Sequence, residues 1–245
     1  MQTERVEIQT ADGAMDADLF LPNGQGPWPL VVFYMDALGL RPALHEMAQH
    51  LTDGGYAVVQ PNLYWRAPAF EPFDPSDVFT NDDERKRLFA LIATVERDQV
   101  VSDTRALLSH FAADARVTTS RVGTVGYCLG GRTAFIVGTE LPFAAVASIH
   151  GGGLVNDTPT SPHLASAKFV GAVYLGVADE DRSCTPEHQA ALNEALTNAG
   201  VDYELELFVG AKHGFAVPDF LVYDEAAAGQ HWKKVLALFD RTLRR

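Results

Sequence analysis

Apolar runs alternate with helical patterns along most of the chain, and this alternation constrains the fold more than any other feature. The continuous apolar run at 30–34 predicts a strand that is covered on both faces. The pattern at 42–51 predicts a helix that ends at two glycines. The same order recurs: the expected strands are 30–34, 56–59, 122–125, 144–149, 169–177 and 203–208, and the expected helices are 42–51, 85–111, one from 129, 186–199 and 224–243. Such an order predicts an α/β fold, with a mainly parallel sheet and helices on both of its faces.

Two segments depart from this alternation. Residues 6–21 alternate polar and apolar side chains around an Asp-Gly turn, which predicts an antiparallel hairpin at one edge of the sheet. The segment 65–83 is rich in proline and acidic residues, and its length predicts a lid or wall of a site, or else a disordered insertion. Because no repeat, linker or shift in composition divides the chain, we expect one domain over residues 1–245.

The balance of charge argues against one class of partner. The chain has 19 Lys and Arg residues against 32 Asp and Glu residues, a formal net charge of −13, and no basic cluster that would neutralise nucleic-acid phosphates. Hydrophobic residues make up 47% of the chain, which is enough for a full core. We expect no signal peptide, because no basic region precedes an apolar run, and no apolar stretch approaches the roughly 18 residues of a membrane span. We therefore expect a cytoplasmic protein that binds neither nucleic acid nor membrane.

A Gly-x-Cys-x-Gly motif lies where an apolar strand passes directly into a helix. The sequence at 126–130 is Gly-Tyr-Cys-Leu-Gly, a nucleophile elbow with cysteine in the place of serine. Side chains at Gly126 and Gly130 would collide with neighbouring backbone in so sharp a turn. The positive end of the following helix favours the thiolate over the thiol. We therefore predict Cys128 as a nucleophile, whereas Cys184 lies outside any such motif and is expected to be incidental.

A thiolate nucleophile needs a base, and the base needs an orienting acid. His213 lies between two loop glycines just past a predicted strand, and Asp179 directly follows Gly-Val-Ala at the exit of another. Ligands of parallel sheets bind at such carboxyl ends of strands. We predict His213 as the general base and Asp179 as the acid that orients it, with Glu180 and Asp181 as the alternatives.

Acyl transfer also needs backbone donors for the oxyanion. The usual pair is the amide after the nucleophile and one amide from the loop after an earlier strand. In this chain those amides belong to Leu129 and to Ala37, which follows the strand expected at 30–34.

These residues, in this order, resemble the dienelactone hydrolase family of α/β-hydrolases. The resemblance spans most of the chain, and its specific part is the cysteine-containing elbow. It rests on four segments: Gly-Tyr-Cys-Leu-Gly-Gly at 126–131, Gly-Val-Ala-Asp at 176–179, His-Gly-Phe at 213–215, and Gly-Gly-Tyr-Ala-Val-Val-Gln-Pro-Asn-Leu-Tyr at 54–64. The resemblance implies an α/β-hydrolase fold in which Cys128, Asp179 and His213 hydrolyse a lactone or small ester through a thioester, with neither metal nor organic cofactor.

The chain departs from the family pattern after the first parallel strand. The family commonly has a Gln-Glu pair there, whereas this chain has Met35-Asp36. The family glutamate holds the proton of the resting cysteine, so the resemblance implies that Asp36 modulates the thiol by contact with Cys128 or with a neighbouring loop amide. The alternative is an acid that only caps the loop.

The substrate pocket has several candidate residues. The family's best-known substrates carry a carboxylate that arginines bind, and the planar fork of arginine suits that group. The arginines near expected loops or strand ends are Arg41, Arg66, Arg132 and Arg182. Tyr64 and His150 are further candidates, the alternatives being an aromatic ring that packs down the lid and a histidine satisfied by loop backbone. Since the net charge of −13 makes arginines paired with acids the commoner case, an anionic substrate is not established.

The sequence thus predicts a hydrolase of a small-molecule lactone or ester. Two other functions remain open on the same fold. A general carboxylesterase or thioesterase would keep the three residues and change the pocket, and a non-catalytic binding protein would lack a reactive sulfur.

Overall fold

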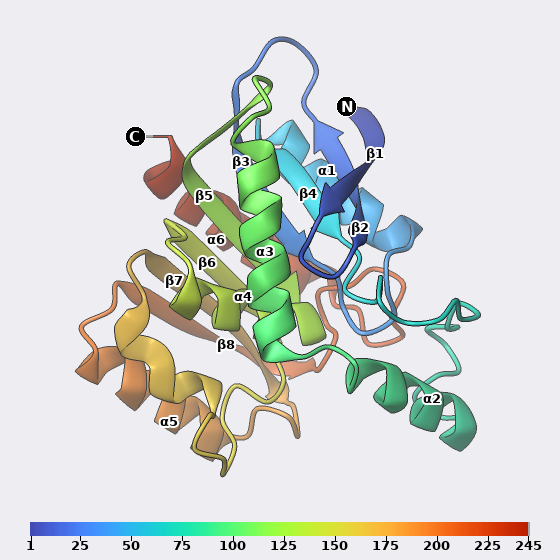
Figure 1. Ribbon diagram of the computed structural model, residues 1–245. Coiled ribbons are helices and arrows are strands. Elements are labelled where there is room, and N and C mark those ends of the chain that lie inside the picture. Colours follow the sequence, from blue (N-terminus) through green and yellow to red (C-terminus); the bar gives the residue numbers. More distant parts are fainter. Residues whose placement is uncertain (245) are drawn as a thin grey trace.

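The computed structural model describes residues 1–244 and contains an eight-stranded sheet with helices on both faces (Figure 1). The strands are β1 (Gln2–Gln9), β2 (Ala14–Leu21), β3 (Trp28–Tyr34), β4 (Ala57–Pro61), β5 (Val117–Tyr127), β6 (Ala145–Ile149), β7 (Ala172–Glu180) and β8 (Tyr203–Lys212). The helices are α1 (Pro42–Asp53), α2 (Asp82–Ile92), α3 (Arg97–Phe111), α4 (Leu129–Glu140), α5 (Pro186–Asn198) and α6 (Glu225–Leu243), with a short 3-10 helix η1 (Pro162–Lys168).

The sheet has the order β1-β2-β4-β3-β5-β6-β7-β8. Every pairing from β4 to β8 is parallel, whereas β1 pairs antiparallel with β2 and β2 antiparallel with β4. This arrangement confirms the predicted mainly parallel sheet and the N-terminal antiparallel hairpin at its edge.

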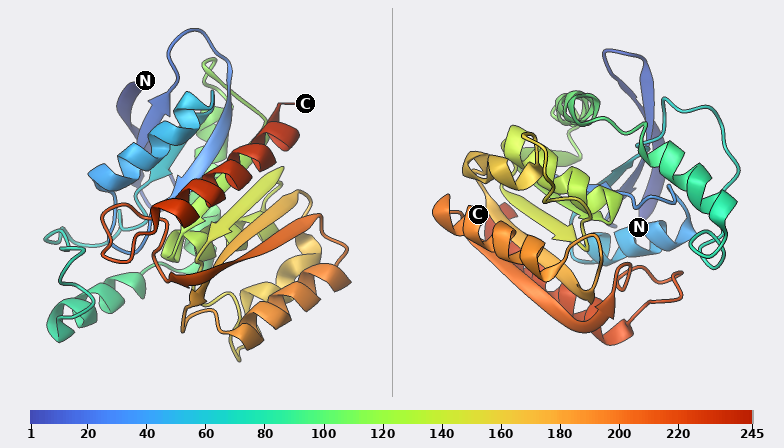
Figure 2. Two further views of the ribbon diagram at one scale, coloured as in Figure 1. Left: turned by 180° about the vertical axis from the view of Figure 1, so that it is seen from behind. Right: turned by 90° about the horizontal axis from the view of Figure 1, so that it is seen from below.

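The sheet separates two apolar cores. On one face, Leu44 of α1 and Val235 of α6 pack in the same buried cluster as Phe33. On the other face, α3, α4 and α5 contribute the second cluster, in which Leu107 and Phe135 are fully buried. Figure 2 shows α1 and α6 crossing the face opposite to α3 and α4. Burial of these faces explains why the strands are continuous apolar runs.

The helix predicted over 85–111 is wrong as one element, because the structure has two helices there. α2 ends at Ile92 and α3 begins at Arg97. The carbonyl of Leu91 accepts hydrogen bonds from the amide and the hydroxyl of Thr94, over 3.0 and 2.7 Å, and these close the turn that ends α2. Leu88 is the buried residue of α2, which projects away from the sheet (Figure 1).

The loops that follow β3, β5, β7 and β8 leave the sheet at its carboxyl end. These strands are parallel, so the residues just past them meet along one edge. That edge carries the candidate site. No helix within residues 1–244 is long and apolar enough to cross a membrane.

Candidate active site

Cys128 lies on a strained turn between β5 and α4. Its backbone has φ 54° and ψ −112°, a conformation that a residue with a side chain rarely adopts. A Cβ atom on Gly126 would lie 2.0 Å from the carbonyl oxygen of Gly130, and one on Gly130 would lie 2.2 Å from the carbonyl oxygen of Tyr34. The two glycines therefore permit the sharp turn that presents the cysteine at the end of the sheet.

His213 contacts Asp181 and not the predicted Asp179. Its Nδ1 donates a hydrogen bond to Asp181 Oδ2 over 2.7 Å. The hydroxyl of Ser183 donates to Asp181 Oδ1 over 2.6 Å and lies 3.2 Å from His213 Nδ1. The expectation that Asp179 lies against His213 is wrong, and the alternative Asp181 occupies that place.

The end of β7 explains this difference. β7 continues to Glu180, two residues beyond Ala178, and its register on β8 shifts between these two residues. Asp179 therefore lies on the strand, where its Oδ2 accepts a hydrogen bond from the amide of Gly210 over 3.0 Å. Asp181 is the first residue past the strand and is 7% exposed, so its side chain reaches the histidine.

The neighbours of His213 determine its charge. Burial lowers its pKa, but the nearby charge of Cys128 and the hydrogen bond with Asp181 outweigh burial, and the pKa lies well above its usual value. Burial raises the pKa of Asp181, but the hydrogen bond and charge of His213, with Ser183, bring it below its usual value. The site therefore favours an imidazolium beside an ionised carboxylate.

The two amides predicted as oxyanion donors are both unpaired. Neither the N–H of Leu129 nor that of Ala37 donates a hydrogen bond within residues 1–244. The carbonyl of Ala37 accepts a hydrogen bond from the Tyr64 hydroxyl over 2.8 Å. Tyr64 is 2% exposed and does not line the cavity beside Cys128. The charge of nearby Cys128 contributes to raising the pKa of Tyr64, after burial. Its hydroxyl fixes the loop that carries Ala37, and its place in the pocket stays a prediction.

Asp36 contacts Arg41 and a loop amide. Its carboxylate accepts hydrogen bonds from both terminal nitrogens of Arg41, over 2.7 and 2.8 Å, and from the Leu38 amide over 2.9 Å. No hydrogen bond joins Asp36 to the Cys128 thiol in the part of the chain described. Of the two predicted contacts, the structure forms the one with the neighbouring loop amide.

Arg41 and Arg66 are both engaged by carboxylates. Arg41 also donates hydrogen bonds to both oxygens of Asp219, over 2.6 and 2.8 Å. Its guanidinium is therefore bound by two carboxylates, those of Asp36 and Asp219. Arg66 pairs with Asp12 and Asp103 and does not line the cavity beside Cys128. The expectation that either arginine is free to bind a substrate carboxylate is wrong.

His150 contacts the backbone of the turn that carries Cys128. It is fully buried, and its Nδ1 accepts a hydrogen bond from the Cys128 amide over 3.1 Å. Its ring centroid lies 5.1 Å from that of His213. Burial, with the charge of His213, holds the pKa of His150 well below its usual value. The prediction that His150 lines the pocket is wrong, because its neutral ring instead holds the backbone of the cysteine.

An apolar cavity of about 380 Å³ lies beside Cys128 and His213. Its walls come from the loop after β3, the segment before α2 and the loop after β8. Besides the cysteine and histidine, the lining residues are Ala37, Leu38, Pro75, Ser76, Phe79, Thr80, Phe220, Leu221 and Val222. The rings of Phe79 and Phe220 meet edge to face, with centroids 5.8 Å apart. The segment 65–83 therefore contributes a wall of the site.

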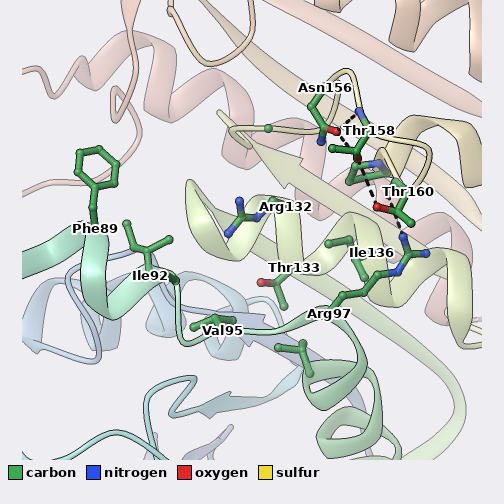
Figure 3. A pocket seen from close by; sticks show the side chains of 14 residues that line it. Phe89, Ile92, Val95, Arg97, Arg132, Thr133, Ile136, Asn156, Thr158 and Thr160 are labelled. Carbon is green, nitrogen blue, oxygen red and sulfur yellow. Dashed lines mark hydrogen bonds between the residues drawn. The ribbon is translucent and has the colours of Figure 1, made fainter.

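A second cavity, of about 410 Å³, lies between α2 and α4 (Figure 3). Phe89 and Ile92 of α2 and Arg132 and Thr133 of α4 project into this region. Neither Cys128 nor His213 is among its lining residues. The apolar cavity is therefore the one that adjoins the reactive groups.

Sequence reasoning missed several residues of the site. Ser183 bonds to both Asp181 and His213, and no motif marks it. Phe79 lies within the segment 65–83 that the sequence predicts as a lid or wall. Leu221 lies outside it and is missed, although a large apolar side chain in a predicted loop is a usable signal. Within residues 1–244, no group of three or more His, Cys, Asp or Glu side chains is arranged to hold a metal ion.

The elbow and the paired histidine and acid, at the carboxyl end of a mainly parallel sheet, define an α/β-hydrolase. The model of the dienelactone hydrolase family matches residues 15–243, and the chain belongs to this family.

Known relatives agree with this assignment. A protein of Synechocystis sp. with the provisional name carboxymethylenebutenolidase is 27% identical over 250 residues, which cover 100% of this chain and 98% of the relative. The carboxymethylenebutenolidase of Pseudomonas putida is 29% identical over 164 residues, 67% of each chain. A crystal structure from Klebsiella pneumoniae subsp. pneumoniae, provisionally a dienelactone hydrolase, has a TM-score of 0.86 at 22% identity and covers 98% of both chains. The family resemblance, the α/β-hydrolase fold and the assignment as a hydrolase are thereby confirmed.

Proposed function

We propose that this chain hydrolyses a lactone or small carboxylic ester through a thioester on Cys128. His213 is the general acid and base, and Asp181 orients it. The observation that carries the proposal is the 2.7 Å hydrogen bond between His213 Nδ1 and Asp181 Oδ2 at a cavity that Cys128 lines. The relatives named carboxymethylenebutenolidase support the same class of substrate.

Acylation uses the charge pair of cysteine and histidine. The Cys128 thiolate attacks the ester carbonyl carbon, and the carbonyl oxygen becomes an oxyanion that accepts hydrogen bonds from the Leu129 and Ala37 amides. The His213 imidazolium then donates its proton to the leaving alkoxide as the carbon–oxygen bond breaks. The raised pKa of His213 supports this step, because the proton is present before substrate binds.

Deacylation reverses the role of the histidine. Neutral His213 takes a proton from water, which attacks the thioester carbonyl carbon, and the sulfur leaves as the thiolate. The acid product departs, and the cysteine and histidine regain their starting charges. The buried Asp181 stabilises the imidazolium in both halves of the cycle.

We assign Asp36 an indirect effect on the thiol's reaction. Its bonds to the Leu38 amide and to Arg41 fix the loop around Ala37, whose own amide stays free for the oxyanion. In this role Asp36 positions an oxyanion donor and leaves the thiol proton to His213.

The test is a panel of lactones and short esters assayed with matched cysteine variants. Cys128→Ala should lose about 10⁴-fold or more in kcat, since it removes the nucleophile. Cys184→Ala is the matched control and should retain activity within about threefold. Turnover that persists in Cys128→Ala, or absence of turnover by the wild type, would contradict the proposal. Lactones, small esters and thioesters in one panel separate a lactonase from a general carboxylesterase or thioesterase.

A further inference from the structure

The apolar cavity contains no formal positive charge apart from His213. Among its described lining residues, the polar side chains are those of Ser76, Thr80, Cys128 and His213, and the others are apolar. Its volume of about 380 Å³ is at the lower end of the range for small-molecule sites. A small apolar group fills such a space without leaving an unpaired charge.

Two of the three segments that form its walls carry acids and neither Lys nor Arg. Residues 67–84 contain no Lys or Arg, and neither do residues 213–232. The acids on these segments are Glu71, Asp74, Asp77, Asp82, Asp83, Glu84, Asp219, Asp224 and Glu225. Four of these acids are paired with cations: Asp82 with Arg85, Asp83 with Lys86, Glu84 with Arg87, and Asp219 with Arg41. The other five form no ion pair within residues 1–244, and their field opposes the approach of an anion to the cavity.

The arginine on the wall segment after β3 is already neutralised. Arg41 donates four hydrogen bonds of 2.6 to 2.8 Å, two to Asp36 and two to Asp219. Its guanidinium carbon also lies 5.3 Å from the centre of the Phe220 ring. A substrate carboxylate would have to displace Asp36, which is fully buried and would be left unpaired, or compete with the more exposed Asp219.

Large apolar side chains are exposed at this cavity. Phe79 is 49% exposed and Leu221 is 79% exposed, and both line the cavity. Such side chains gain free energy when an apolar ligand covers them.

We propose that the substrate of this site is a neutral ester or lactone with an apolar group, and that the enzyme discriminates against carboxylate-bearing esters. The apolar cavity holds that group, and the acidic walls disfavour an anion. This inference rests on the proposed ester hydrolysis at Cys128.

The experiment compares two esters that differ only at the far end of the acyl chain. Para-nitrophenyl hexanoate ends in a methyl group, and the mono-para-nitrophenyl ester of adipic acid ends in a carboxylate at the same position. The hexanoate should have a kcat/KM about 100-fold higher, because the carboxylate finds no partner in the cavity. Added salt should narrow the difference by screening the acidic walls. Within the neutral series, each methylene should raise kcat/KM by about fourfold until the cavity is full.

A second experiment introduces a positive charge into the wall of the apolar cavity. Leu221→Lys should raise kcat/KM for the adipate ester by about fivefold and lower it for the hexanoate. Leu164→Lys is the matched control, since Leu164 is 61% exposed on η1 and does not line the cavity, and it should change neither value.

The outcomes separate this proposal from the function on which it rests. If the wild type hydrolyses the adipate ester as well as or better than the hexanoate, the substrate class is overturned, although the hydrolase stands. If the wild type prefers the adipate ester and Arg132→Gln abolishes that preference, the carboxylate of the ester binds near Arg132, at the cavity between α2 and α4. If neither ester nor any lactone is turned over in a Cys128-dependent manner, the proposed function itself fails.

Discussion

The two cysteines of this chain show how position sets the chemistry of one side chain. Cys128 is partly exposed at the N-terminus of α4 and lines a cavity with His213. Cys184 is 2% exposed and packs in the core under α3, α4 and α5. Burial, with the charge of Asp181, raises the pKa of Cys184 to about 12, so it is a thiol at neutral pH. Asp181 therefore has opposite effects on the two cysteines. It stabilises the imidazolium of His213 beside Cys128, and its charge suppresses the ionisation of Cys184.

The largest expected effect on activity comes from removing the charge of Asp181. Asp181→Asn should lower kcat by about 10³- to 10⁴-fold, because the amide no longer stabilises the imidazolium. Asp179→Asn, two residues away, should change kcat by less than about threefold, since Asp179 bonds a loop amide instead. Steady-state kinetics on a neutral activated ester measure both. Equal losses in the two variants would mean that the 2.7 Å contact is not the functional one.

The pH dependence of kcat/KM should also distinguish Asp181 from Asp179. Acylation needs the imidazolium, so kcat/KM falls as pH rises through the pKa of His213, which lies well above its usual value. Asp181 helps to raise that pKa, so Asp181→Asn should move the alkaline limb to lower pH, by about one unit or more. Asp179→Asn should leave the limb in place. A limb that stays fixed or moves upward in Asp181→Asn would contradict the assignment of charges.

The smallest expected difference is in stability. Cys128→Gly should raise the free energy of unfolding by about 1 kcal/mol, because glycine relieves the strain of φ 54°. Cys184→Ala should lower it by about 1–2 kcal/mol, since it leaves a void in a packed core. Urea unfolding measures both. The opposite order would show that Cys128 is not strained or that Cys184 is not a packing residue.

The fold follows from the sequence because buried parallel strands and amphipathic helices leave strong periodic signals. The break between α2 and α3 was not predicted, since the apolar pattern continues across it and Val95 itself packs on both cores. Local hydrogen bonds, among them those of Thr94, close the turn that ends the first helix.

The site was predictable where the backbone requires a residue type. Gly126 and Gly130 are required by collisions below 2.5 Å, so they mark Cys128 as the cysteine of the turn. The sequence does not show which acid contacts His213. Both Asp179 and Asp181 lie near the end of β7, and a register shift there determines which of them faces the histidine.

The predictions for the arginines failed for a different physical reason. Arg41 pairs with Asp36, five residues before it, and also with the distant Asp219, and Arg66 pairs with the distant Asp12 and Asp103. The distant pairings depend on the tertiary fold, and the local sequence carries no signal for them.

The most direct test of the central claim, that Cys128 carries the acyl group, is mass spectrometry of the enzyme during turnover of a neutral ester. In Asp181→Asn, where deacylation is slow, the intact mass should increase by one acyl group, and peptide mapping should place that group on Cys128. The adduct should be labile to hydroxylamine, as a thioester is, and should persist when Cys184→Ala is added. An acyl group on any other residue, or rapid turnover in Cys128→Ala, would contradict the claim.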